Sequence, residues 1–269
     1  MPGFKYNFLK GAGYYSIESF ENTGKVRTCF SSRIGGVSEG MYNSLNLGYK
    51  SGDKKTDIDK NMNILCDAAE FNINDLVLSD QNHGSNCKIV NSGDRGKGII
   101  IESDILGVDA LVTNCRNLAL CIFTADCVPV FLLDTENDVI ALCHAGWRGI
   151  VGNIIPKTID TMRRNFNTKP EKLLAAIAPS IGPCCFNVGT DVIKEFQNLF
   201  GDGENIIINE NGNYKINLWN AAKEQLVKAG IESDIVNSEM CTFCNEKEFY
   251  SYRRDGKSTG RMVSIIQLI

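Results

Sequence analysis

Apolar and polar residues form alternating blocks in the middle of the chain, and these blocks predict three consecutive elements. Val128–Leu133 is an apolar run of strand length, and Val139–Cys143 is a second one. Asp134–Asp138 between them is polar and turn-like, so the two runs are predicted to pair as an antiparallel hairpin. Gly149–Phe166 carries apolar residues along one helical stripe, which predicts an amphipathic helix.

The predicted hairpin places a thiol next to an imidazole. If Leu133 pairs with Val139, Cys127 lies almost opposite His144 at the open end of the hairpin. The Cβ atoms of directly opposed residues are about 4.5–5.5 Å apart. Such a pair can form an activated nucleophile, because the imidazole takes the thiol proton, or it can bind a metal ion. It can equally be a buried cysteine beside a hydrogen-bonded histidine, with no chemistry at all.

Periodicity elsewhere predicts helices and strands in an irregular order. Helices are predicted at Asp57–Phe71, Asp191–Phe200 and Asn217–Ala229, and one or two strands within residues 1–30. Further strands are predicted at Cys87–Val90, Val108–Thr113, Leu118–Phe123, Leu173–Ile177, Phe249–Tyr252 and Met262–Leu268. Strands and helices do not alternate regularly, and no repeat or linker divides the chain. The pattern therefore predicts a single α+β domain over residues 1–269 rather than a doubly wound sheet.

Composition narrows the class of protein. The chain has 269 residues, of which 43% are hydrophobic, and a formal net charge of −4. This charge argues against general nucleic-acid binding, and no apolar run reaches the roughly 18 residues of a membrane span. The N-terminus has no continuous apolar signal core. Eleven cysteines in a chain of this length are expected to be reduced thiols, which predicts a cytoplasmic protein.

The chain contains only two histidines, His83 and His144. His83 lies in Asp80–Asn86, a polar, glycine-containing stretch between apolar segments, and loops of this kind often carry functional groups. If this loop folds onto the mouth of the hairpin, Cys127 and the two imidazoles form one site. Three protein ligands with an open fourth position are typical of catalytic zinc sites.

Four other cysteines have a spacing that suits a metal. Cys241 and Cys244 have the C-x-x-C spacing of zinc knuckles and redox motifs, and Cys184 and Cys185 could in principle supply two more ligands. Adjacent cysteines seldom bind one tetrahedral ion, and no second C-x-x-C occurs in the chain. The favoured interpretation is therefore a set of small buried residues and a loop.

Several motifs, taken in chain order, resemble one known family. They are Ser32-Arg-Ile-Gly-Gly-Val-Ser38, Ser44-Leu-Asn-Leu47, Gln81-Asn-His-Gly84, Val108-Asp-Ala-Leu-Val-Thr113, Thr124-Ala-Asp-Cys-Val-Pro-Val130, His144-Ala-Gly-Trp-Arg-Gly149, Ile181-Gly-Pro-Cys-Cys-Phe186 and Phe249-Tyr-Ser-Tyr-Arg-Arg-Asp-Gly256. From about residue 25 to about residue 265 the chain resembles the laccase-domain, or polyphenol-oxidase-like, family. Members are also described as peptidoglycan editing factors and as purine nucleoside phosphorylases with adenosine deaminase activity. The resemblance implies a β-sandwich-like core flanked by helices.

The resemblance also implies a set of site residues, a metal and substrates. His83, Cys127 and His144 would hold zinc, with copper as the other candidate metal, and Cys127 and His144 would be catalytic. Asp126, next to Cys127, is a candidate base or orienting group. Purine nucleosides and phosphate would be the substrates, and the residues expected to bind them are Arg33, Asn46, Arg148, Arg253 and Arg254. Arginine suits phosphate because its planar guanidinium matches the phosphate oxygens.

Other functions remain open on the sequence alone. A cysteine hydrolase or deamidase would use Cys127 as nucleophile and His144 as base without a metal, which suits the peptidoglycan-editing description. Copper oxidation of phenols is the least favoured, because two histidines cannot build a multinuclear copper centre. A non-enzymatic binding role and a homodimer also remain open. The zinc signature of nucleobase deaminases is excluded, because Ser85 and Gly146 stand where it requires glutamate.

Overall fold

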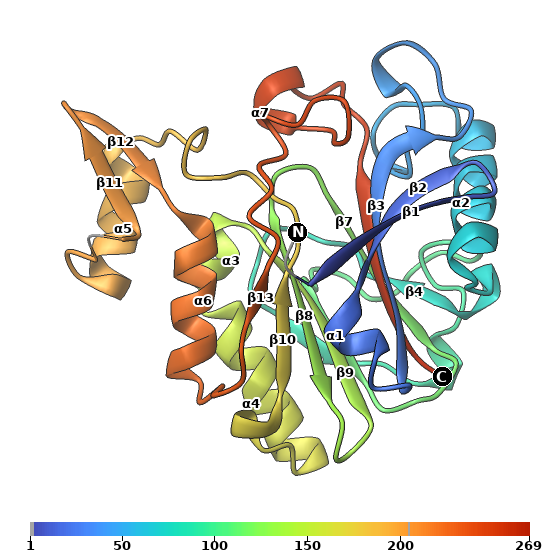
Figure 1. The fold of residues 1–269 in the computed structure, drawn as a ribbon, viewed down its shortest axis with the longest axis horizontal. Coiled ribbons are helices and arrows are strands. Elements are labelled where there is room, and N and C mark those ends of the chain that lie inside the picture. Colours follow the sequence, from blue (N-terminus) through green and yellow to red (C-terminus); the bar gives the residue numbers. More distant parts are fainter. Residues whose placement is uncertain (1–2, 204) are drawn as a thin grey trace.

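Two six-stranded sheets packed face to face form the centre of the protein (Figure 1). The computed structural model describes residues 3–203 and 205–269. In spatial order, the first sheet consists of β1 (Phe4–Leu9), β2 (Ala12–Ile17), β3 (Val26–Gly35), β14 (Met262–Leu268), β7 (Ala119–Thr124) and β4 (Leu76–Leu78). The second consists of β13 (Val236–Asn237), β10 (Leu174–Ile177), β8 (Val128–Asp134), β9 (Val139–Ala145), β6 (Ala110–Thr113) and β5 (Cys87–Ile89). A separate two-stranded sheet is formed by β11 (Ile207–Glu210) and β12 (Asn213–Ile216).

Helices cover the outer faces of both sheets (Figure 1). The first sheet is covered by α2 (Lys55–Ala69), and the second by α4 (Ile154–Phe166) and α6 (Leu218–Lys228). The remaining helices are α1 (Glu18–Glu21), α3 (Trp147–Val151), α5 (Thr190–Phe200) and α7 (Tyr252–Asp255), with short 3-10 turns at Gly40–Tyr42, Ile73–Asp75, Ser92–Asp94 and Pro170–Lys172. Within the residues described, no helix combines the length and the apolar character that a membrane crossing requires.

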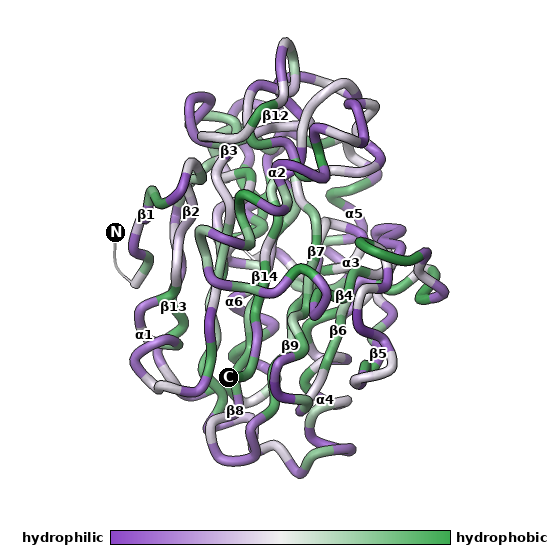
Figure 2. Tube along the Cα trace, turned by 90° about the vertical axis from the view of Figure 1, so that its right-hand side faces the viewer, coloured by the Kyte–Doolittle hydropathy of each residue, from purple (hydrophilic) through white to green (hydrophobic). Residues whose placement is uncertain are grey.

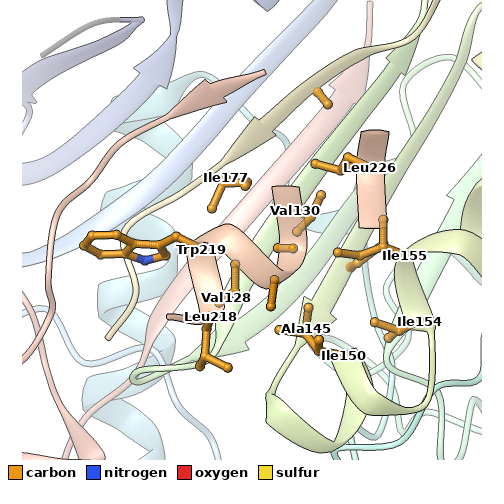
Figure 3. Close-up of a cluster of buried hydrophobic side chains, with 14 of the residues drawn as sticks. Val128, Val130, Ala145, Ile150, Ile154, Ile155, Ile177, Leu218, Trp219 and Leu226 are labelled. Atoms are coloured by element: carbon orange, nitrogen blue, oxygen red, sulfur yellow. The ribbon is translucent and has the colours of Figure 1, made fainter. Parts of the chain in front are cut away.

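The two central strands, β8 and β9, are buried on both faces. Phe131 of β8 and Leu142 of β9 point between the sheets, where the core also contains Phe30 and Ile122 of the first sheet. Because side chains alternate across a strand, Val130 points the other way, into the layer beneath α4 and α6 (Figure 3). Figure 2 shows the same division, with hydrophobic strands such as β9 and β14 inside and hydrophilic turns outside.

The α+β class and the sandwich-like core predicted from the sequence are confirmed. Most predicted elements occur within about two residues of their predicted bounds. The side chain of Asn217 accepts a hydrogen bond from the backbone N–H of Asn220 at 3.1 Å, so Asn217 caps α6. Strands β1, β2 and β3 begin within residues 1–30, so the prediction of one or two strands there was too low.

The helix predicted at Gly149–Phe166 is two helices, and this prediction was wrong. The first, α3, already begins at Trp147, and the chain breaks before α4. The break lies at Asn153, whose φ of 60° is left-handed and cannot continue a right-handed helix. The apolar stripe runs through both helices, so periodicity alone did not reveal the break.

The strand predicted at Phe249–Tyr252 is not formed by these residues. Phe249 and Tyr250 are buried in the layer between the sheets as part of a loop. Ser251 then caps α7, because its side chain accepts a hydrogen bond from the backbone N–H of Arg254. Aromatic residues are enriched in strands, but here Phe249 and Tyr250 are fully buried without forming strand hydrogen bonds.

Candidate active site

The mouth of the β8–β9 hairpin carries both Cys127 and His144. The register differs by one residue from the predicted one: Asp134 pairs with Val139, and His144 therefore pairs with Pro129. Continuing the ladder by one position places Cys127 diagonally across from His144, on the same face of the hairpin. The predicted register was wrong, and it would have placed the two side chains on opposite faces.

His83 completes a cluster of three possible metal ligands at this mouth. One ligand atom from each of His83, Cys127 and His144 lies within 4.8 Å of the others. The two imidazole rings meet edge-on, with centroids 4.9 Å apart and an interplanar angle of 74°. His144 is buried and Cys127 is half-buried, whereas His83 is exposed. The cluster therefore reaches solvent on the side of His83.

A fully buried carboxylate, Asp109, links both histidines. Its Oδ1 lies 2.7 Å from Nδ1 of His144 and accepts the backbone N–H of His83 at 3.0 Å. Its Oδ2 accepts the backbone N–H of Gly84 at 2.8 Å. These bonds hold the loop in a conformation in which His83 has a left-handed φ of 62°. Sequence analysis missed Asp109, although a lone carboxylate inside the apolar run Val108–Thr113 was a signal for a buried partner.

The ionisable groups of the cluster shift one another's pKa. Burial alone would raise the pKa of the Cys127 thiol, but the neighbouring imidazoles outweigh burial and lower it to about 6. Burial would lower the pKa of His144, but the Cys127 thiolate and Asp109 raise it to about 9. Burial also opposes ionisation of Asp109, yet the hydrogen bond and the charge of His144 lower its pKa. In the protein without metal, a thiolate and an imidazolium therefore coexist near neutral pH.

The donor set fits zinc. One thiolate sulfur and two imidazole nitrogens are ligands that Zn²⁺ takes, and three protein ligands would leave a fourth position for water or substrate. Because Nδ1 of His144 faces Asp109, its Nε2 is left with the lone pair that a metal needs. A carboxylate behind a ligating histidine is a common feature of zinc sites, where it fixes the ring and raises its basicity.

Gly146, at the end of the hairpin, makes room for this cluster. A Cβ atom at this position would lie 3.1 Å from Sγ of Cys127 and 3.4 Å from the ring of His83. Both distances are at or below the usual limit for a Cβ contact. Glycine therefore allows the thiol and the His83 loop to approach the same point.

Comparison with known protein families shows where the whole chain belongs. The model of the family described as "Multi-copper polyphenol oxidoreductase laccase" matches residues 27–269. The chain belongs to this family.

Three known proteins are similar to the chain over most of its length. A purine nucleoside phosphorylase of Bacteroides thetaiotaomicron is 36% identical over 260 residues, which cover 95% of each chain. "Adenosine deaminase RL5" from an unknown prokaryotic organism is 35% identical over 195 residues, which cover 70% of this chain and 73% of the relative. The crystal structure of Bacillus licheniformis hypothetical protein YfiH has a TM-score of 0.93 at 31% identity and covers 100% of both chains.

Asp126 directly precedes Cys127, and it anchors the loop before β8. Its Oδ1 accepts the hydroxyl of Thr242 at 2.6 Å. Its Oδ2 accepts the hydroxyl of Ser251 at 3.0 Å and the backbone N–H of Arg253 at 2.7 Å. Asp126 was predicted to be a base or an orienting group. Its bonds engage both carboxylate oxygens and fix the loop that carries Cys127.

Arg33, predicted to bind substrate, is engaged within the protein. Its guanidinium donates to the backbone carbonyl of Asn43 at 2.6 and 2.9 Å and to that of Glu246 at 3.0 Å. It also stacks on the ring of Tyr250, with the guanidinium carbon 4.5 Å from the ring centroid. These contacts tie the loop after β3 to the segment before α7.

Sequence analysis missed Arg261, which lies near the cluster. Burial lowers the pKa of its guanidinium, and the negative charges of Cys127 and Asp126 oppose this change. The guanidinium is therefore close enough to interact with both charges. Asn46, predicted to bind substrate, is fully buried and accepts the backbone N–H of Arg261 at 2.9 Å. A Cβ atom at Gly48 would lie 2.5 Å from Cγ of Arg261, so this glycine makes room for the side chain.

The other three arginines of the family motifs differ in how free their guanidinium groups are. Arg148 is exposed and stacks on Trp147, with the guanidinium carbon 4.2 Å from the ring centroid. Arg253 is also exposed and donates to the backbone carbonyl of Asn187 at 2.7 Å. Arg254 donates to three backbone carbonyls and is tied down within the protein. Arg148 and Arg253 therefore present their charge to solvent.

The structure also gathers the other four cysteines with metal-like spacing. The sulfur atoms of Cys184, Cys185, Cys241 and Cys244 lie within 4.8 Å of one another. Sequence analysis favoured small buried residues and a loop here, because adjacent cysteines seldom bind one ion, but Cys184 and Cys244 are exposed and all four sulfur atoms converge. We call this group the cysteine cluster.

Proposed function

We propose that the protein is a zinc-dependent purine nucleoside phosphorylase that also deaminates adenosine. The observation that carries this proposal is the convergence of His83, Cys127 and His144 beside the buried carboxylate of Asp109. The names of two relatives, a purine nucleoside phosphorylase and an adenosine deaminase, support it. The proposed nucleosides are adenosine, inosine, guanosine and methylthioadenosine.

His83, Cys127 and His144 would hold the zinc ion. When bound, zinc lowers the pKa of a coordinated water toward about 7 and so supplies a nucleophile near neutral pH. The protein favours the ionised and oriented forms of two ligands that bind a metal. The Cys127 thiol ionises near pH 6, and Asp109 turns Nδ1–H of His144 away from the site. The loop conformation that Asp109 imposes then decides whether His83 completes the donor set.

Phosphorolysis requires that phosphate and nucleoside be held together next to this cluster. A phosphate oxygen forms a bond to C1′ of the ribose while the bond from C1′ to the purine breaks. The purine leaves with the proton that the attacking hydrogen phosphate gives up, and ribose 1-phosphate is the second product. Positive charge near the phosphate favours this arrangement, and the arginines proposed to supply it are Arg261, Arg148 and Arg253. Arg33, Asn46 and Arg254 are proposed to shape the walls of the site through their internal bonds.

Deamination uses the same nucleoside with water in place of phosphate. Water adds to C6 of the adenine ring and ammonia leaves, which gives inosine. This reaction needs no phosphate contact. The ratio of adenine to inosine formed from adenosine therefore reports how the site divides its two reactions.

A second candidate function follows from the charge state of the cluster without metal. A Cys127 thiolate beside a protonated His144 is the ion pair that cysteine hydrolases use. Cys127 would then attack an amide carbonyl, His144 would protonate the leaving amine, and water would release the acyl group. His83 is not a reacting group in this mechanism, whereas the zinc site requires it as a ligand, and that difference separates the two candidates.

Replacement of His83 tests the proposal. We expect His83→Ala to lose about one zinc ion per chain together with both adenosine reactions, because two remaining ligands hold zinc poorly. Zinc is measured by elemental analysis of protein purified without added metal. Adenine and inosine are measured by chromatography, with and without phosphate. Ser85→Ala, in the same loop but outside the cluster, is the matched control.

Other outcomes would contradict the zinc-dependent mechanism. A metal-free wild type with full turnover would assign Cys127 the role of nucleophile. A His83→Ala variant that keeps most of its activity would do the same. Loss of activity without loss of zinc would mean that His83 contacts substrate rather than metal.

We also propose a cytoplasmic location. Its support is the cysteine content, since eleven cysteines occur in a chain far longer than the small secreted scaffolds that disulfides stabilise. Reduced thiols are what both Cys127 and the cysteine cluster require for metal binding.

A further inference from the structure

We propose that the cysteine cluster binds a second zinc ion as a structural tetrathiolate site. Its four sulfur atoms belong to Cys184, Cys185, Cys241 and Cys244, and they lie within 4.8 Å of one another. They come from two loops that are about sixty residues apart in the chain. The cluster shares no residue with the candidate active site, so this inference does not rest on the proposed function.

The distances between the sulfur atoms match a shared metal ion. Sγ of Cys244 lies 3.6 Å from Sγ of Cys184 and 3.4 Å from Sγ of Cys185. Zn–S bonds of about 2.3 Å in a tetrahedron place sulfur atoms about 3.8 Å apart, whereas a disulfide is only about 2.05 Å long. All four cysteines are free thiols. Their spacing is therefore that of ligands around one ion rather than that of a covalent pair.

The local turn explains how adjacent cysteines can reach one point. Residues 183–185 form a turn, closed by a hydrogen bond from the N–H of Cys185 to the carbonyl of Gly182 at 3.0 Å. In this turn both Cys184 and Cys185 approach Cys244. Adjacent cysteines seldom bind one tetrahedral ion, and this turn is what brings both of them toward the same partner here.

The backbone around Cys241 is arranged to support a thiolate. The N–H of Gly182 donates to Sγ of Cys241 at 3.2 Å, and hydrogen bonds to an ionised sulfur stabilise its charge. A Cβ atom at Gly182 would lie 3.1 Å from Cβ of Cys241 and 2.8 Å from the ring of Trp219. Trp219 is itself held by a hydrogen bond from its indole N–H to Ser180 at 2.7 Å. Glycine is thus what allows this N–H to approach the sulfur.

Positive charge lies beside both loops. Zinc binding to four thiols releases their protons and leaves a site with a net charge of about −2. Arg254 donates to the carbonyls of Thr242 and Phe243, the two residues between the cysteines of the C-x-x-C segment. Arg253 donates to the carbonyl of Asn187 in the other loop. The two guanidinium groups therefore contribute charge of the sign that such a site needs.

The second zinc would brace the loop that carries Cys127. Thr242, inside the C-x-x-C segment, donates its hydroxyl to Asp126 at 2.6 Å. Ile181, just before the other pair of cysteines, donates its N–H to the backbone carbonyl of Asp126 at 2.9 Å. Asp126 directly precedes Cys127, so both loops of the cysteine cluster contact the rim of the candidate active site. A metal that joins the loops would make this rim more rigid.

Zinc content in matched variants tests the inference. We expect the double variant Cys184→Ser/Cys244→Ser to hold about one zinc ion fewer per chain than the wild type. Cys115→Ser, which removes a half-buried cysteine outside both clusters, should hold as much as the wild type. His83→Ala should keep the zinc of the cysteine cluster. If the active site holds no metal, the difference between the wild type and the double variant is unchanged, so the two proposals fail separately.

If the double variant does not fold, replacement of zinc by cobalt tests whether the cysteine cluster binds a metal ion. In His83→Ala, four thiolates around Co²⁺ should give strong sulfur-to-cobalt charge transfer and the visible spectrum of a tetrahedral ion. Equal zinc in the wild type and in a folded double variant would overturn the inference, as would the absence of this spectrum. A Cys185–Cys244 disulfide in metal-free protein purified under reducing conditions would overturn it too.

Discussion

The side chains of the candidate site come from separate segments, and Asp109 is the contact that two of these segments share. A buried carboxylate is costly unless it is paired, and here it accepts hydrogen bonds from the ring of His144 and from the backbone of the His83 loop. Hydrogen bonds to charged groups contribute about 1.5–3 kcal/mol each. The same bonds that stabilise Asp109 therefore orient two of the three ligands.

The charge state of Cys127 leads to a prediction about pH. In the metal-free protein the pKa of this thiol is lowered to about 6, so its thiolate forms as the pH rises through about 6. The thiolate is the reactive form, and alkylation by iodoacetamide should reach half its maximal rate near pH 6, against about 8.5 for an ordinary thiol. Peptide mass spectrometry after timed alkylation at each pH measures the rate.

His144→Gln is the control for this experiment, because it removes the positive charge that stabilises the thiolate. The midpoint of alkylation should then move to higher pH. The zinc-loaded wild type should be protected from alkylation across the pH range. A wild-type midpoint near that of an ordinary thiol would contradict the pairing of Cys127 with His144.

Two arginines test where phosphate binds. Lysine keeps the positive charge but lacks the planar fork of arginine. We expect Arg261→Lys and Arg148→Lys to lower kcat/KM for phosphorolysis of adenosine roughly tenfold or more, because a charge-assisted hydrogen bond is lost. Deamination should change much less, since only phosphorolysis needs the phosphate contact. Arg164→Lys, an exposed ion-paired position on α4, serves as the control. Equal losses in both reactions would place the arginine in nucleoside binding or in structure.

At the scale of elements, the β8–β9 hairpin fixes which face Cys127 and His144 share. Gly146→Ala tests how closely the His83 loop must approach that hairpin. The added methyl would lie 3.1 Å from Sγ of Cys127, and overpacking of this kind costs about 1–3 kcal/mol. We expect a folded protein whose zinc affinity, measured by competition with a chelating dye, falls on the order of tenfold.

Gly203→Ala is the matched control, because its Cβ would find only ordinary contacts of 3.5–3.7 Å. It should leave zinc affinity unchanged. If Gly146→Ala also binds zinc as the wild type does, the loop and the hairpin are not as tightly apposed as the distances indicate.

Sequence periodicity could predict most elements but not how they meet. The strand at Met262–Leu268 and the cap of α6 were predictable, because an apolar run and an Asn before a helix are local signals. The register of the β8–β9 hairpin depends on its turn, and a slip of one residue leaves the hydrophobic pattern of two fully buried strands unchanged. Patterning specifies register only where one face is polar.

The candidate ligands were predictable for a different reason. A chain with only two histidines limits the choice, and each lies within two residues of a glycine, Gly84 or Gly146. The apolar run around Asp109 was a signal that this carboxylate is buried, but it did not show which residues bind it. Arg261 was not predictable, because a single charge beside a strand looks the same in sequence whether it is solvated or buried. The contacts of Asp109 join segments 26 and 35 residues apart, and that of Arg261 with Asn46 joins segments 215 residues apart.

At the scale of the whole molecule, the hydrophobic layer between the two sheets packs against one face of the β8–β9 hairpin. Phe131 is fully buried in this layer. We expect Phe131→Ala to lower the free energy of unfolding by about 3–5 kcal/mol, because removal of the buried phenyl ring leaves a cavity. Urea denaturation should show a lower midpoint with an unchanged slope. Zinc content of the folded fraction should stay as in the wild type.

Phe8→Ala is the matched control, since the side chain of Phe8 on β1 is 56% exposed. It should change the free energy of unfolding by no more than about 0.5 kcal/mol. Similar losses in both variants would mean that the inter-sheet layer is not the main core.

The position of β14 affects how the protein is made. This strand follows all other described strands in the chain, yet it lies between β3 and β7 in the first sheet. A ribosome therefore delivers it after the two strands that it joins. Until then β3 and β7 each expose an unpaired edge, and such edges pair readily with other chains. The period of greatest aggregation risk for this protein is thus its own synthesis, before β14 has entered the gap.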